Sequence, residues 1–441
     1  LSNAYNNTGM ETKSLDIKDK NMLALLPITT DPYNDIVLGN KFTWYKDEAS
    51  GKTVSKENAF DSNGNLKEGI VAVKGVQGSG AGQTINTLSK NFKYPQVFRA
   101  NIGIDQEFDG GWKLTLDALF SKTFNNIYFR NIALEQKGTL LPVGKSNIDV
   151  AAPVYGAKTS DYSTIVSLGN TSKGYSYSLS AKIDKHFEFG LDLMAAYTYG
   201  HSYTCNDGLS SQAHSNLSTL KSVDINNPEL SYSIFDQPHK VSAVAMYTSP
   251  SYAGGLMRTS ISLTYSGTSG QRYSYIFYDT TDTDINGDGI ALNTLLYIPT
   301  EDEVLSMNWS KNADAVAFED FIASDKYLRT HRGQWSERNA GISPFEHHFD
   351  MQIAQDIFYD KANKRKLQVT LDVVNLSNML NRNWGLYYAN SLYRAPLTVD
   401  GKTIDIAGNI TPKYSFRNDN VIYLSDFSSR WRCQLGVKLT F

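Results

Sequence analysis

The last twelve residues of the chain alternate without a break between apolar and polar side chains. Successive side chains of a β-strand point to opposite faces. Residues 430–441 are slightly longer than the roughly 9–11 residues with which a tilted strand crosses a bilayer, and an ordinary soluble strand is about half that length. One face would carry Trp431, Cys433, Leu435, Val437, Leu439 and Phe441. We therefore expect a membrane-spanning strand that ends on an aromatic residue.

The same alternation recurs in eight earlier segments, so we expect nine such strands. The segments are 98–104, 112–118, 175–184, 191–199, 241–247, 257–265, 348–357 and 366–373. Their polar faces carry full charges in mid-strand, which a dry sandwich core tolerates only when the charges are paired. A barrel with a wet or plugged lumen tolerates them. The pattern predicts an all-β fold, the C-terminal part of a transmembrane antiparallel β-barrel. The alternative is a large extracellular sheet with one solvated face.

The charged side chains of these polar faces are the residues that we expect to face the lumen or a plug. They are Arg99, Asp105, Lys113, Asp117, Lys182, Asp184, Arg258, Asp350, Asp356, Lys366, Asp372, Arg430, Arg432 and Lys438. They include both signs, so plug docking and salt bridges within the barrel wall are favoured over substrate contact.

The connections between the segments alternate between short and long. The joins at Asp109–Gly111, Glu188–Gly190, Ser249–Gly255 and Tyr359–Lys364 are short turns. The other joins are about 50 residues after Ser121, about 35 after Tyr203, about 75 after Gly267 and about 50 after Asn378, with boundary errors of a few residues. Outer-membrane barrels have short periplasmic turns and long external loops. We expect a bacterial outer-membrane protein whose C-terminus lies at the periplasmic side.

Composition agrees with a barrel and argues against other classes. No stretch reaches about 18 apolar residues, so we expect no membrane-spanning helix. The net charge of −3 argues against nucleic acid as a partner. Tyrosines recur near the strand ends, where interfacial girdles place them. No catalytic triad context, CxxC motif or helix-borne His pair is present. We therefore predict that the chain is not an enzyme and requires no cofactor.

Five segments carry a family resemblance, namely 94–105, 235–242, 265–273 with 284–289 and 297–299, 372–381, and 429–441. In this order they resemble the C-terminal barrel of TonB-dependent receptors of Bacteroidetes, especially the Oar-like group. The resemblance implies a barrel of about 22 strands with a plugged lumen. It also implies energised uptake of a large or scarce nutrient, with the TonB complex as a partner through an N-terminal region. The related SusC-like transporters pair with a surface lipoprotein, so such a partner is an expectation here.

These expectations divide the chain into two parts. Residues 1–93 would be an extracellular loop region following a strand that ends near residue 1, and residues 94–441 would hold the C-terminal strands and loops. The N-terminal plug is absent from this sequence, so we expect the C-terminal part of a longer polypeptide. Outer-membrane lipid and lipopolysaccharide would surround it. The alternatives to a transporter are a surface binding or adhesion protein and a passive channel.

One loop has the oxygen spacing of a calcium site. Asp284, Asn286 and Asp288 occupy alternate positions before a glycine, Ile290 offers a carbonyl, and Asp282 adds a carboxylate upstream. The position that would carry a bidentate Glu is Leu295. The segment is therefore either a calcium loop or a solvated Asx-rich turn.

A run of aromatic residues in the same long connection offers a candidate substrate contact. The residues are Tyr273, Tyr275, Phe277 and Tyr278. They would either stack on a sugar or peptide or pack the loop itself, and the sequence does not separate these two roles.

Overall fold

The computed structural model describes residues 43–50, 53–62, 65–74, 84–144, 148–158, 164–360, 362, 365–418 and 422–441. Of the expected loop region at residues 1–93, residues 1–42, 51–52, 63–64 and 75–83 lie outside the described residues. Strands account for 53% of the structure and helices for little, so the prediction of an all-β fold is confirmed. No helix in the described part of the chain is long and apolar enough to cross a membrane.

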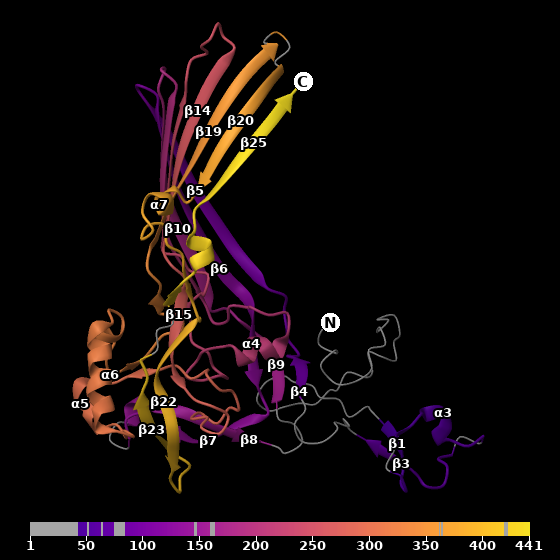
Figure 1. The fold of residues 1–441 in the computed structure, drawn as a ribbon. Coiled ribbons are helices and arrows are strands. Elements are labelled where there is room, and N and C mark those ends of the chain that lie inside the picture. Colours follow the sequence, from indigo (N-terminus) through magenta and orange to yellow (C-terminus); the bar gives the residue numbers. More distant parts are fainter. Residues whose placement is uncertain are drawn as a thin grey trace.

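Nine long strands form one continuous antiparallel sheet, which we call the wall (Figure 1). In chain order they are β5 (Gln96–Phe108), β6 (Trp112–Asn131), β10 (Gly174–His186), β11 (Leu191–Thr204), β13 (His239–Thr248), β14 (Met257–Thr268), β19 (Glu346–Asp360), β20 (Arg365–Val374) and β25 (Arg432–Thr440). Each strand pairs with the next one in this order.

Short turns join the wall strands in pairs at one end. The turn between β5 and β6 contains Gly110 and Gly111 at φ +79° and +77°, a conformation that glycine adopts without steric cost. The four long connections all leave the other end and form a compact region that we call the cap (Figure 1). The cap comprises the described residues within 132–144, 148–158, 164–173, 205–238, 269–345, 375–418 and 422–431.

The cap contains a second sheet with its own core. The sheet order is β18 (Gly341–Ile342), β15 (Arg272–Tyr278), β22 (Tyr393–Ile404), β23 (Ile410–Phe416), β7 (Leu134–Leu140) and β8 (Ala152–Ala157). Helices α5 (Glu301–Ser306) and α6 (Asn312–Ser324) lie beside it (Figure 1). The large apolar cluster of the molecule is here and includes Phe277, Leu296, Phe318, Leu397 and Tyr414. The wall leaves its apolar residues exposed. Burial of apolar surface therefore stabilises the cap more than the wall.

Strand β6 links these two regions. The far half of β6 continues into the cap, where it pairs with β9 (Thr164–Thr171), and β9 pairs in parallel with β4 (Thr84–Leu88). Smaller elements are η1 (Ile148–Val150), α4 (Ala213–Ser218), β12 (Ser231–Tyr232), β16 (Tyr297–Ile298), η2 (Leu328–Thr330), β17 (Gln334–Trp335), α7 (Leu376–Leu380), β21 (Tyr388–Asn390), β24 (Ile422–Leu424) and α8 (Asp426–Ser429). Near the N-terminus, β1 (Thr43–Asp47), β2 (Thr53–Val54) and β3 (Ile70–Lys74) form a small sheet with α3 (Lys56–Ala59).

Candidate functional site

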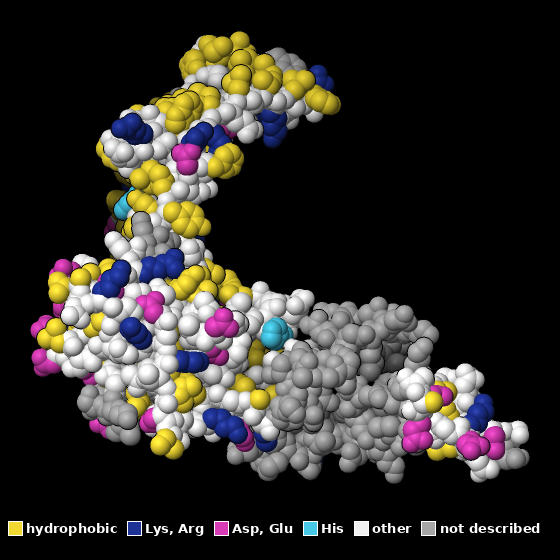
Figure 2. All heavy atoms as spheres, turned by 60° about the horizontal axis from the view of Figure 1, so that its bottom comes forward, with side chains coloured by type: hydrophobic (Ala, Val, Ile, Leu, Met, Phe, Trp, Pro, Cys, Tyr) yellow, Lys and Arg dark blue, Asp and Glu magenta, His cyan; other side chains and the backbone are white. Residues whose placement is uncertain are grey.

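One face of the wall is apolar and largely exposed. Ile102 and Leu435 are each 73% exposed and Leu179 is 53% exposed, although large apolar side chains in a soluble protein are normally covered when they are contiguous. Figure 2 shows hydrophobic side chains along the outer side of the curved wall. A sheet with this face suits lipid as its surroundings.

Aromatic and histidine side chains border this apolar face at the cap end. Tyr197 Oη lies 2.7 Å from His239 Nδ1, and Tyr265 Oη lies 2.8 Å from His347 Nδ1. The Tyr175 and Tyr203 rings stack with centroids 4.8 Å apart. Such rings place an apolar body and a polar tip at a membrane interface.

A second aromatic border lies at the turn end of the wall. Lys185 Nζ lies 5.7 Å from the Trp112 ring centroid and 5.0 Å from that of Phe187. Gln355 is polar within an apolar strand face, and its Oε1 accepts from Thr259 Oγ1 at 2.7 Å and Tyr252 Oη at 3.0 Å. About 10 residues of each strand separate the two borders. With a rise of roughly 3.3 Å per residue and a strand tilt near 40° from the membrane normal, the apolar band is about 25 Å tall.

The opposite face of the wall carries the predicted lumen-facing charges together. The register places thirteen of the fourteen on this face, namely Arg99, Asp105, Lys113, Asp117, Lys182, Asp184, Arg258, Asp350, Asp356, Lys366, Asp372, Arg432 and Lys438. Arg430 is the exception, because it precedes β25 and pairs with Asp426 at the start of α8. Trp431 and Phe441 likewise flank β25, whereas Leu435, Val437 and Leu439 lie within it.

Several of these charges pair within the wall. Asp356, which is 9% exposed, accepts from Lys366 Nζ at 3.0 Å and Gln368 Nε2 at 2.8 Å. Lys182 lies 2.8 Å from Asp184, and Lys113 lies 3.9 Å from Asp105. Pairing lowers the cost of removing such charges from water.

Other charges of the polar face have different surroundings. Asp350 accepts the backbone N–H of Asn375 at 2.7 Å, and Asp372 accepts from Gln352. Among the described residues, Arg99, Asp117 and Lys438 have no hydrogen bond or ion pair through their side chains. Charges of both signs are therefore left available on this face.

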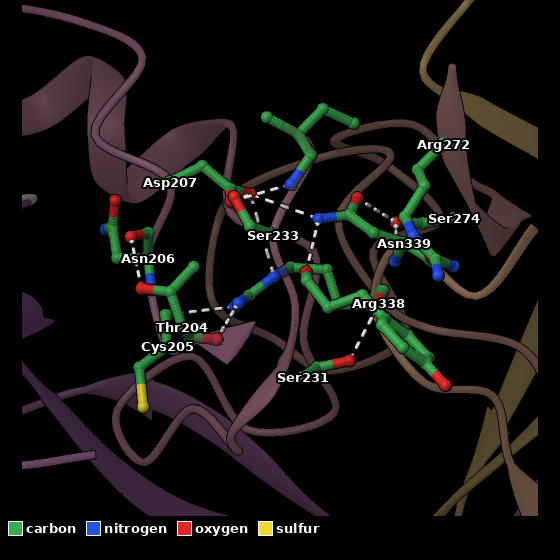
Figure 3. Close-up of polar contacts among 12 residues, drawn as sticks. Thr204, Cys205, Asn206, Asp207, Ser231, Ser233, Arg272, Ser274, Arg338 and Asn339 are labelled. Atoms are coloured by element: carbon green, nitrogen blue, oxygen red, sulfur yellow. Dashed lines mark hydrogen bonds and ion pairs between the residues drawn. The ribbon is translucent and has the colours of Figure 1, made fainter. Parts of the chain in front are cut away.

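A buried polar junction joins the top of the wall to the cap, and Figure 3 shows part of it. Asp236, which follows β12, lies 2.7 Å from Nε and 2.6 Å from Nη2 of Arg272 at the start of β15. The same carboxylate accepts the Ser202 N–H at 2.6 Å and lies 3.1 Å from His201 Nδ1. Because the pair is almost fully buried, each ion depends on its partner.

A second arginine completes the junction. Arg338 donates to the carbonyl oxygens of Cys205 and Thr204 (Figure 3), and its Nε lies 3.8 Å from Asp207. Burial lowers the pKa of Arg338, and Asp207 opposes that shift. Asn339 donates to the Tyr232 carbonyl at 2.9 Å and to Asp207 at 3.1 Å. Four distant stretches of the chain are thereby fixed to one another.

Comparison with known families decides the class of the sheet. The family model described as an outer membrane beta barrel domain matches residues 33–387. The chain belongs to this barrel family. The predicted outer-membrane location is therefore supported, and the two wall faces are those of an outer-membrane barrel. No curated protein matches the chain in sequence.

Three of the four aromatic residues predicted to contact substrate are not surface residues. Tyr273, Tyr275 and Phe277 are 4%, 1% and 0% exposed and belong to the cap core. Tyr275 Oη donates to Asp325 Oδ2 at 2.6 Å, and burial raises its pKa. Tyr278 is half-buried beneath the Arg417 guanidinium, whose Cζ lies 4.3 Å from its ring centroid. Substrate contact through the first three is corrected to packing, because both faces of β15 are buried from Arg272 to Phe277.

The Asp/Asn loop is also buried, so the expectation of a solvated turn is wrong. Asp284, Asn286 and Asp288 are 5%, 2% and 4% exposed. Asp284 accepts the N–H groups of Gly287 and Gly289 at 2.9 and 2.7 Å. Asp282 is exposed, and Ile290 donates its N–H to Asp288 at 2.8 Å.

Calcium binding at this loop stays a prediction of the sequence. Burial and the nearby Asp284 raise the pKa of Asp288 to about 7. Within the described ranges, no three His, Cys, Asp or Glu side chains gather as a metal site.

Proposed function

We propose that this chain is the barrel portion of a TonB-dependent outer-membrane transporter that takes up a large or scarce nutrient through a plugged lumen. The observation that carries the proposal is the polar face of the wall. It combines paired charges with Arg99, Asp117 and Lys438, which lack partners among the described residues. Unpaired charges of both signs suit a protein plug or a hydrated lumen better than a filled small barrel.

The edges of the wall support a barrel larger than nine strands. Within the described part of the chain, β5 pairs only with β6 and β25 pairs only with β20. An open sheet edge is not tolerated against lipid because its backbone groups lack partners. Closure by further strands of a longer polypeptide, as in a barrel of about 22 strands, satisfies both edges.

The proposed orientation places the cap outside the cell and the short turns and C-terminus in the periplasm. Long external loops and short periplasmic turns are the usual layout of such barrels. A cysteine at Ile406, which is fully exposed at the tip of the β22–β23 hairpin, should react on intact cells with a maleimide that does not cross membranes. A cysteine at Ala253 in the β13–β14 turn should react only after the outer membrane is opened, and the reverse pattern would contradict the orientation.

The transport proposal is tested with the full-length protein in its native membrane. A plugged transporter should show little conductance in planar bilayers, should cross-link to TonB in living cells, and should cease uptake when the inner-membrane proton gradient is collapsed. A steady open conductance would instead indicate a passive channel.

A surface binding protein is the second candidate, and the cap favours it. The cap has a large apolar core and a buried polar junction, so it is a built domain rather than a set of loose loops. Such a protein would bind its ligand on intact cells but would neither cross-link to TonB nor accumulate the ligand.

A further inference from the structure

Two apolar hollows lie next to each other on the lipid-facing side of the wall. The first, of about 500 Å³, lies between strands β14 and β19 and the segment 376–388, which we call the flap. The second, of about 360 Å³, lies over β10, β11, β13 and β14. Both are lined by Leu263 and Phe349. The two hollows therefore form one groove that runs from the flap down the wall.

The flap is held in place by hydrogen bonds rather than by apolar packing alone. Asn375 adopts φ +57° before α7, and its Nδ2 donates to the Gly385 and Ser429 carbonyls at 2.7 and 2.8 Å. A Cβ on Gly385 would lie 1.9 Å from Asn375 Oδ1, so this close approach requires glycine. At the far end the Tyr388 N–H donates to Glu346 Oε1 at 2.7 Å. The groove wall is thus preformed.

The flap nevertheless directs apolar side chains outward. Leu380 is 67% exposed and Trp384 is 56% exposed, and both line the first hollow. Apolar side chains at such positions are covered by lipid in a membrane protein, and a tryptophan suits the interface.

Small side chains form the floor of the second hollow. Ala195 is paired in register with Ala243, and Ala245 with Leu193. Leu263 and Tyr265 on the next strand stand opposite Ala245 and Ala243. The alanines leave space that the flanking larger residues enclose, and the lining is almost entirely apolar.

We propose that this groove binds an acyl chain of lipid A, the glycolipid of the outer leaflet. The groove is lined by residues of the lipid-facing side of the wall, among them Leu263 and Phe349. Its first hollow lies at the cap-end border beside the paired Tyr265 and His347. Arg382 is exposed and is the one charged residue of the flap sequence, so it is placed to meet a lipid phosphate. A hollow of this volume is in the range that holds a small ligand.

The inference rests on the proposed outward position of the cap but not on energised transport. Larger side chains on the floor of the second hollow should displace the bound acyl chain, because each methylene excluded from an apolar site weakens acyl-chain binding. The full-length protein is purified from outer membranes in mild detergent, and native mass spectrometry measures the lipid retained. We expect lipid A to be retained in preference to phosphatidylethanolamine, and the double variant Ala243→Leu/Ala245→Leu to lower the retained lipid A by about tenfold.

Two further variants separate the parts of the site. Trp384→Ala should also weaken retention, and Arg382→Gln should lower retention of lipid A while leaving that of phosphatidylethanolamine unchanged. Leu371→Ala, on the lipid-facing side of β20 outside the groove, is the matched control and should behave like the wild type.

Retention that is equal for all lipids, or unchanged in the floor variant, would overturn the proposal. Preferential retention of phosphatidylethanolamine would also overturn it and would point to the opposite leaflet. None of these results depends on uptake, so failure of the transport proposal would be recognised separately by the TonB cross-link and conductance measurements.

Discussion

At the residue scale, the polar junction shows why two separate sequence segments belong together. Asp236 and Arg272 are 36 positions apart and meet in a buried ion pair. The Arg272 guanidinium also lies 3.7 Å from the Tyr232 ring centroid, a distance at which a cation and an aromatic face attract each other. Because Asp236 also contacts Ser202 and His201 of β11, the pair links the end of the wall to strand β15 of the cap core.

Removal of one partner of this pair should loosen the cap. Asp236→Asn leaves Arg272 buried and without its charge partner, which we expect to destabilise the cap by about 3–5 kcal/mol. Hydrogen exchange of residues 269–345 in the folded protein would measure the effect. Asp426→Asn removes an exposed ion pair with Arg430 and should leave exchange unchanged. Equal exchange in Asp236→Asn and the wild type would contradict the structural role.

Lys221 gives the cap a dependence on pH. Its Nζ donates to the Leu292 carbonyl at 2.7 Å, and burial lowers its pKa to about 8 from 10.5. In the folded state the lysine releases its proton at a lower pH than in the unfolded chain. Stability should therefore rise as the pH increases from about 8 towards 10.5 and should be lowest below that window.

Denaturant unfolding of the cap, followed by tryptophan fluorescence at pH 7.5 and 9.5, tests this dependence. We expect a higher midpoint at pH 9.5, and Lys221→Met should reduce the difference. A wild-type midpoint that falls between these two pH values, with no change in the variant, would contradict the assignment.

At the element scale, regular strands were predictable and the cap was not. The wall strands alternate with period two because one face meets lipid and the other a polar interior, and this signal is present in each strand by itself. The cap sheet instead pairs β15 in parallel with β22 and β23 with β7. Such contacts join distant loops, so Tyr273 and Tyr275 carried no local sign of burial.

In the candidate site, the residues of the wall strands were predictable from the sequence and the contacts within the cap were not. Alternation assigned fourteen charges to one face, and the register places thirteen of them there. Arg430 lies outside the strand because α8 ends immediately before it. Neither the Asp236–Arg272 contact nor the burial of the Asp284 loop follows from spacing, since each depends on which connections meet above the wall.

The two wall faces should respond oppositely to the same substitution. Ile261→Arg places a charge on the lipid-facing side in mid-strand and should destabilise the barrel by about 2–4 kcal/mol. Ser262→Arg places the same side chain on the polar face, where we expect little effect. Urea titration of the full-length protein in lipid vesicles, with the folded band detected by its electrophoretic mobility, compares them. Similar losses in both variants would be inconsistent with the assigned faces.

At the scale of the whole molecule, the protein combines two differently stabilised parts. The cap has a conventional apolar core, whereas the wall exposes its apolar face. This division explains why the long connections form an ordered domain. Alternate side chains of the wall strands face lipid, and the proposed transport, orientation and lipid site all depend on this arrangement.

The most direct test is a spin-label scan along β14 in the full-length protein in outer-membrane lipid. Labels at 261 and 263 should be accessible to oxygen dissolved in the bilayer, and labels at 260 and 262 should be accessible to a water-soluble nickel reagent. An alternation with period two is the predicted result. Labels at 261 and 263 that are shielded from both reagents, or reached by the nickel reagent, would contradict a lipid-facing wall and would favour an extracellular sheet.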